Sequence, residues 1–361
     1  MAHVRRYDRY IARHVMTMSG LVALVLIALF SFISFIGDVD DAGQGSFGLL
    51  KLGAFTVLMM PTALYTLLPV IALLGTMAGM GVLSSQSELT ALRASGISTF
   101  RLAGSALMAG VITATMAVAL GDFVAPWTAD RAERLKASAR LGGGGAAVEV
   151  QRPAWLRVGN DVVHALNIQS PEVMGPVELF ELDGAGALLA WSQIDEMRYD
   201  ASRQRWQLSG VSRTEFADER VRSNTEAAAE WGGDLSPEVL QLLLLEADST
   251  SIRGLMRLVD YLDANALDTV RAERSLWRKL MVPLTVLAMT FFAVPFVFGS
   301  MRDSGMGQRL FLGVLIGVAF FVINEVSLSI GQLFGWPAIV GAGLPSLALV
   351  VAGFWKLRRA R

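Results

Sequence analysis

Residues 52–87, LGAFTVLMMPTALYTLLPVIALLGTMAGMGVLSSQS, decide the fold class of this protein. None of these 36 positions is Asp, Glu, Lys or Arg. An α-helix of this length, rising about 1.5 Å per residue, exceeds the roughly 30 Å hydrocarbon core of a bilayer. No polar hairpin turn interrupts the run. We therefore expect one long membrane-spanning helix, kinked at Pro61 and Pro69, rather than two short helices.

Charge is segregated along the rest of the chain. Of the 63 Asp, Glu, Lys and Arg residues, 42 fall in residues 130–279, and the other 211 residues contain 21. The sequence therefore predicts an α-helical membrane protein with six transmembrane helices and one polar insert between helices 3 and 4. The six spans are expected at about residues 15–37, 53–83, 100–125, 278–299, 309–331 and 337–356.

Composition and motifs exclude several kinds of site. The chain has no cysteine and only three scattered histidines, so we expect no metal site. The net charge of −1 gives no basic field that would attract nucleic acid. No P-loop, G-x-S-x-G or H-E-x-x-H motif occurs. We therefore expect a protein that is not an enzyme and binds no cofactor itself.

The orientation follows from the Lys and Arg residues in short loops, which favour the cytoplasmic side. With six spans, the loops on one side carry twelve basic residues, whereas the short loops on the other side carry only Lys51. We therefore expect both termini in the cytoplasm and the insert outside the membrane. The twelve residues are Arg5, Arg6, Arg9, Arg13, Arg93, Arg101, Arg302, Arg309, Lys356, Arg358, Arg359 and Arg361.

The polar insert has the pattern of an all-β domain. Residues 145–250 alternate short apolar runs with turn signals, and hairpin turns are predicted at residues 183–186 and 200–202. This pattern is typical of a β-sandwich or jellyroll. We expect this jellyroll domain, with a trailing helix, at residues 141–265, between membrane halves at 1–140 and 266–361. Residues 251–280 have helical periodicity and would return the chain to the membrane.

An amphipathic segment separates two apolar runs at residues 84–98, SSQSELTALRASGIS. Leu89 and Leu92 form an apolar stripe, Ser87 stands where a helix would begin, and Gly96 where it would end. A short helix is therefore predicted at about residues 85–95. It is either a plain helix on the membrane surface or a docking helix for a cytoplasmic motor.

The segment SELTALRASGIS resembles the cytoplasmic coupling helix of the LptF/LptG permeases, which belong to the lipopolysaccharide exporter. YDRYIARHV at 7–15, DDAGQGSFGLLKLGAFTVLMMP at 40–61 and GDFVAP at 121–126 resemble further segments of that family. The AGQGS run at 42–46 favours the G branch over the F branch. Together with the six spans and the β insert, the resemblance covers the whole chain.

The resemblance implies a permease subunit of an ABC transporter that extracts lipopolysaccharide from the inner membrane of a Gram-negative bacterium. The subunit would pair with an LptF-type permease, dock two LptB-type ATPases that hold ATP and Mg, and accept the helix of LptC beside span one. It would pass its substrate to a periplasmic bridge of jellyroll domains that includes LptA. The alternatives are the F-type permease itself, or a membrane-anchored periplasmic binding protein or receptor without a transport role.

The resemblance also assigns candidate docking residues. Glu88 would be the main anchor for a basic residue of the ATPase, because complementary charges fix the register of an interface. The apolar side chains of the same helix would fill a groove on the ATPase. The expected docking residues are Glu88, Leu89, Leu92 and Arg93.

Basic residues just past span three would hold the phosphates of lipopolysaccharide. The stretch DRAERLKASAR supplies Arg131, Arg134 and Lys136 as the substrate-binding candidates. The alternative is a solvated helix of mixed charge, because Asp130 and Glu133 interleave with the basic residues.

The outer end of span one departs from the family pattern. Family members often have lysines there, whereas this chain reads SFIGDVDDAGQGS at 34–46, with Asp38 among its acids. That basic contact is therefore not carried over. Glu325 is the one charged residue in the interior of a span, away from the span ends, and such acids usually face a cavity or a partner. Contacts with a gate or a partner are expected at Phe35, Asp38 and Glu325.

Overall fold

A computed structural model describes residues 6–41, 46–140, 154–217, 220–233, 235–244, 250–298 and 305–359. The chain forms two compact units. One is helical and comprises residues 1–40, 52–132 and 273–361; the other comprises 41–51 and 133–272 and contains the strands.

Six helices of the described chain are long and apolar enough to span a membrane, which confirms the predicted number. The third span passes from α4 through a π-helical segment, Leu120–Val124, into α5 without a break. The helices are α1 (Arg6–Gly37), α2 (Leu49–Ser85), α4 (Thr99–Ala119) with α5 (Ala125–Arg140), α8 (Val270–Phe298), α9 (Met306–Leu333) and α10 (Ala338–Arg359).

Helix α2 is continuous over 37 residues although it contains Pro61 and Pro69, as the uninterrupted apolar run predicted. Its second half packs closely against α1 through two glycines. A Cβ atom at Gly79 would lie 2.7 Å from the Cα of Val15, and one at Gly75 would overlap Ser19. Small residues spaced four apart allow helix backbones to approach in a membrane.

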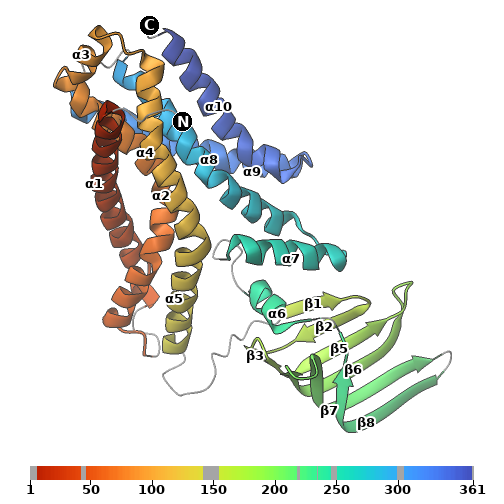
Figure 1. Ribbon diagram of the computed structural model, residues 1–361. Coiled ribbons are helices and arrows are strands. Elements are labelled where there is room, and N and C mark those ends of the chain that lie inside the picture. Colours follow the sequence, from red (N-terminus) through yellow and green to blue (C-terminus); the bar gives the residue numbers. More distant parts are fainter. Residues whose placement is uncertain are drawn as a thin grey trace. The chain divides into compact units, whose positions relative to one another are not determined.

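One hydrophobic core joins the start of α1 to the loop between α2 and α4 and to the end of α10. Ile11, Leu89 and Leu357 are all buried in it. Leu89 belongs to a short helix, α3 (Glu88–Ala94), which lies at the same end of the helical unit as the start of α1 (Figure 1). The start of α9 contacts this region too, because Arg309 donates to the carbonyl of Gly81 at 3.1 Å.

The second unit contains one antiparallel sheet of eight strands, which confirms the all-β insert (Figure 1). The long strand β6 is its centre: β5 and β4 pair with successive parts of one edge, and β7 pairs with β6 over most of its length. The strands are β1 (Ala154–Val158), β2 (Asp161–Ala165), β3 (Ile168–Ser170), β4 (Val173–Met174), β5 (Val177–Leu182), β6 (Leu188–Asp200), β7 (Arg205–Ala217) and β8 (Arg220–Trp231).

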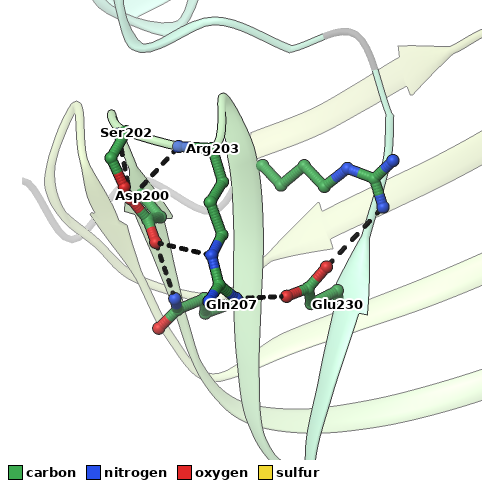
Figure 2. Close-up of polar contacts among 6 residues, drawn as sticks. Asp200, Ser202, Arg203, Gln207 and Glu230 are labelled. Atoms are coloured by element: carbon green, nitrogen blue, oxygen red, sulfur yellow. Dashed lines mark hydrogen bonds and ion pairs between the residues drawn. The ribbon is translucent and has the colours of Figure 1, made fainter.

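Both predicted hairpin turns are present in the sheet. Asp183 begins the turn between β5 and β6, and Asp200 begins the turn between β6 and β7. The Asp200 carboxylate accepts hydrogen bonds from the Ser202 amide at 2.9 Å, the Ser202 hydroxyl at 2.6 Å, the Arg203 amide at 3.4 Å and the Gln207 side chain at 2.9 Å (Figure 2). The Arg203 guanidinium pairs with both Asp200, at 3.9 Å, and Glu230 on β8, at 2.9 Å. These bonds hold the turn against the neighbouring strand.

The core of the second unit is built around Trp206, which is fully buried and donates through Nε1 to the Leu235 carbonyl at 2.8 Å. Two helices follow the strands, α6 (Pro237–Leu244) and α7 (Ile252–Ala264). Tyr261 on α7 enters the same core and donates to the Arg157 carbonyl at 2.9 Å. The helical run predicted at 251–280 is broken after α7, because Ala266 has a left-handed φ of 52° and Asp268 caps the start of α8.

Candidate functional site

The short helix α3 ends at the predicted glycine. Gly96 has a φ of 92°, its amide bonds to the Arg93 carbonyl, and the Ile97 amide bonds to the Leu92 carbonyl. These paired bonds form a Schellman motif, in which glycine is favoured because its backbone is left-handed. The start of α3 differs from the expectation. Ser87 has a φ of 61° instead of the extended backbone of an N-cap, and its side chain makes no capping bond.

The apolar stripe of α3 faces the protein's own core. Leu89 is 2% exposed and packs with Ile11 and Leu102. The Leu89 side chain is therefore already covered by its own chain, and its expected role in filling a groove on another protein stays a prediction. Leu92 is half-buried against the same core. Arg93 is exposed, with its guanidinium 5.7 Å from the ring centre of Phe298.

Glu88 is the first residue of α3, and its carboxylate has a partner that the sequence did not reveal. The hydroxyl of Tyr10 on α1 donates to Glu88 Oε1 at 3.1 Å. Two residues earlier on α1, Asp8 is 4% exposed and accepts bonds from Arg101 at 3.1 Å and Ser105 at 2.6 Å, both on α4. Asp8 is the one acid before the apolar part of span one, a signal that could have drawn attention to this contact.

The three basic candidates all lie on α5 but not on one face. Arg131 and Arg134 are both exposed, and their spacing of three residues makes them neighbours on a helix surface. The guanidinium of Arg131 stacks 3.6 Å from the ring centre of Trp127. Lys136 is half-buried and, two residues beyond Arg134, projects about 200° further around the helix. The geometry therefore groups Arg131 with Arg134.

Glu325 on α9 has a partner within its own chain. Arg274 on α8 forms an ion pair with the Glu325 carboxylate and also donates to Gln332 Oε1 at 3.4 Å. The sequence indicated a partnered acid but not which residue pairs with it. Phe35 and Asp38 lie at the opposite end of α1 from Tyr10, and both side chains are half-buried.

A buried lysine marks the π-helical segment of the third span. Lys279 on α8 is 6% exposed, and its Nζ donates to the Gly121 carbonyl at 3.3 Å. The ring of Tyr65 on α2 lies 5.9 Å from the same Nζ. Within the described ranges, no group of three or more His, Cys, Asp or Glu side chains is placed to hold a metal ion.

These features define a multi-pass membrane protein with an all-β unit between its third and fourth spans and a short amphipathic helix between its second and third. The family model for the lipopolysaccharide export system permease LptF/LptG matches residues 9–359, and the chain belongs to that family. It is therefore a transporter component of the inner membrane.

The curated relatives are similar over their whole length. The chain is 29% identical over 353 residues to the lipopolysaccharide export system permease protein LptG of Escherichia coli K12, covering 98% of each chain. It is 26% identical over 366 residues to LptG of Haemophilus influenzae, covering 99% of each chain. These similarities confirm the resemblance stated from the sequence.

Proposed function

We propose that this chain is the G-type permease subunit that extracts lipopolysaccharide from the inner membrane, driven by a separate LptB-type ATPase. Both relatives described above are LptG proteins, matched almost end to end. An F-type permease would complete the membrane pair, and the β unit would join the periplasmic bridge. ATP and Mg would be held by the ATPase.

The observation that carries this proposal is the placement of Glu88. It begins a short helix that is fixed to the helical unit by Leu89, while its carboxylate remains half-exposed. A helix that transmits force between two proteins needs a rigid base and an accessible charged contact. A basic residue of the ATPase would pair with this carboxylate, and such a pair sets the register of an interface.

The ends of the helices that meet near α3 support a cytoplasmic position for this region. The start of α1, the start of α9 and the end of α10 all contribute to it, and their loops hold most of the chain's short-loop basic residues. By the positive-inside rule this end faces the cytoplasm. The β unit, inserted between the third and fourth spans, is then periplasmic.

Two apolar surfaces fit helical partners or lipid. The part of α1 beyond Ser19 exposes a row of large apolar side chains, and so does the face of α9 before Glu325. An F-type permease and the LptC helix would cover part of these surfaces. Exposed members of these two surfaces include Leu24, Phe32, Ile33, Phe311, Leu315 and Val318.

Co-purification tests the proposal. The tagged wild-type chain, co-expressed with an F-type permease and the ATPase, should retain both proteins. Glu88→Ala should lose most of the ATPase while keeping the permease partner, because only the cytoplasmic contact changes. Thr90→Ala, at an exposed position of the same helix, is the matched control and should retain both. ATPase retention in Glu88→Ala at the wild-type level would refute the docking assignment.

A further inference from the structure

The first turns of α1 make a polar connection to both sides of the loop that carries α3. Tyr10 reaches Glu88 at the start of α3. Tyr7 and Asp8 reach Arg101 near the start of α4, with distances of 3.1 Å from Arg101 Nε to the Tyr7 hydroxyl and 3.1 Å from Nη2 to Asp8 Oδ2. These hydrogen bonds connect the start of α1 to residues 78 to 94 positions later in the sequence, on α3 and α4.

Asp8 fixes the first turn of α1 against α4. Its Oδ1 accepts the Ser105 hydroxyl and its Oδ2 accepts the Arg101 guanidinium, so both oxygens are used, and the side chain is buried. A buried carboxylate with two directional partners of this kind holds one geometry, because losing either bond is costly. The position of α1 relative to α4 is therefore set just before Tyr10.

The ring of Tyr10 is also supported from its own helix. The His14 ring lies 4.4 Å from it, one turn later, with the two planes inclined at 56°. Tyr10 remains 40% exposed, so it lies at the surface beside the Glu88 carboxylate. Two contacts therefore position the Tyr10 hydroxyl. The Tyr10 ring packs on one side against His14, and α1 is bonded to α4 through Asp8.

Glu88 has little else to orient it. Ser87 gives no capping bond, so the start of the helix supplies no side-chain bond that would fix this turn. Within the described part of the chain, the Tyr10 hydroxyl bonds Oε1, and Oε2 accepts no hydrogen bond. A carboxylate has about four acceptor positions, so Oε2 can still receive a bond from another protein.

We propose that Tyr10 is a positioning residue for docking: it holds Glu88 Oε1 so that Oε2 is presented to a basic side chain of the ATPase. This inference rests on the proposed function. It also links α1 directly to the docked carboxylate, because Tyr10 contacts Glu88 and Asp8 holds the same helix start against α4.

A double-mutant cycle tests the inference. Affinity of the ATPase for the complete permease pair in nanodiscs is measured with wild type, Tyr10→Phe, Glu88→Gln and the double variant. Tyr10→Phe deletes one hydroxyl and should weaken docking by about 2- to 10-fold, the range of one hydrogen bond. In the Glu88→Gln background the same change should have less than half that effect, because the charged acceptor is gone. Thr17→Val, an exposed change on the same helix, should leave the affinity unchanged.

The outcomes separate this inference from the proposed function. Weaker docking in Glu88→Gln with wild-type docking in Tyr10→Phe overturns the inference alone. Equal losses from Tyr10→Phe in both backgrounds also overturn it, because they show an effect that does not pass through Glu88. Wild-type docking in Glu88→Gln overturns the docking assignment and the inference together. A merely structural role of Tyr10 would lower the melting temperature without coupling to Glu88.

Discussion

Arg274 on α8 and Glu325 on α9 form an ion pair that neutralises an acid inside a membrane span. Arg309, at the start of α9, is 16 residues from Glu325, a distance of about 24 Å along a helix. The pair therefore lies in the half of the span remote from α3. It joins two helices that follow each other in the chain, so it braces the second half of α9 against α8.

Removing Arg274 should destabilise the helical unit. Arg274→Ala leaves the Glu325 carboxylate without its cation near apolar surroundings, which should cost on the order of 1–3 kcal/mol. We expect a melting temperature lower by several degrees, measured by tryptophan fluorescence in detergent. Adding Glu325→Gln to Arg274→Ala should recover most of the loss, because no uncompensated charge remains. A double variant as unstable as the single one would show that the ion pair is not the cause.

Enlarging Gly79 should separate α1 from α2. Its missing Cβ leaves room for the backbone of Val15, and overfilling a packed contact of this kind costs about 1–3 kcal/mol. Gly79→Val should therefore lower the melting temperature. Gly20→Ala on α1, where no atom lies within 4 Å of an added Cβ, is the control and should not. Equal stability of the two variants would contradict close packing at Gly79.

The basic residues of α5 should contribute unequally to substrate binding. Arg131→Ala with Arg134→Ala removes two neighbouring guanidinium groups, each suited to a phosphate. We expect photo-crosslinking to lipopolysaccharide to fall about tenfold, two or three times more than in Lys136→Ala, whose side chain points elsewhere. Dephosphorylated lipopolysaccharide should crosslink equally to all three proteins. A Lys136→Ala loss as large as that of the arginine pair would reject the grouping.

The turn between β6 and β7 should make the insert sensitive to acid. Hydrogen bonds from the Ser202 hydroxyl and amide lower the pKa of Asp200 (Figure 2). A carboxylate whose folded pKa is below its unfolded value, about 3.9, stabilises the fold above that pH and loses the contribution as pH falls further.

Ser202→Ala removes the hydroxyl and should reduce the melting temperature of the insert at pH 7, and this difference should shrink progressively as the pH falls below about 4. Circular dichroism of the full chain across this range measures the difference. Ser202→Thr keeps the hydroxyl and should follow the wild type. A Ser202→Ala difference that persists at low pH would assign the effect to something other than the Asp200 charge.

The sequence predicted the fold from properties that are local. Uncharged runs indicated the spans, and turn residues such as Asp183 and Asp200 marked the hairpins, because span length and turn chemistry depend on neighbours in the chain. The amphipathic stripe of α3 was predicted correctly as well. Periodicity does not say what covers such a stripe, however, and Leu89 is covered by α1 and α4 of its own chain.

The polar partners could not be predicted in the same way. Glu325 was recognised as an acid in need of a partner, yet Arg274 is 51 residues away, and its approach depends on how α8 and α9 rotate against each other. The bond from Tyr10 to Glu88 spans 78 residues and depends equally on packing. The docking, substrate and gate roles assigned to single residues remain predictions.

The π-helical segment Leu120–Val124 sets the direction in which the next helix points its side chains. Its wide turn accommodates one residue more than an α-helix would. Deleting one residue there would restore a regular helix and turn every later side chain of α5 by about 100° around the axis. The Arg131 side chain would then point in a different direction around the helix, although Arg131 itself would be unchanged. The Lys279 bond to the Gly121 carbonyl holds this extra turn in place. One extra residue in the backbone thus sets the angle, about the helix axis, between the side chains of α4 and the charged side chains of α5.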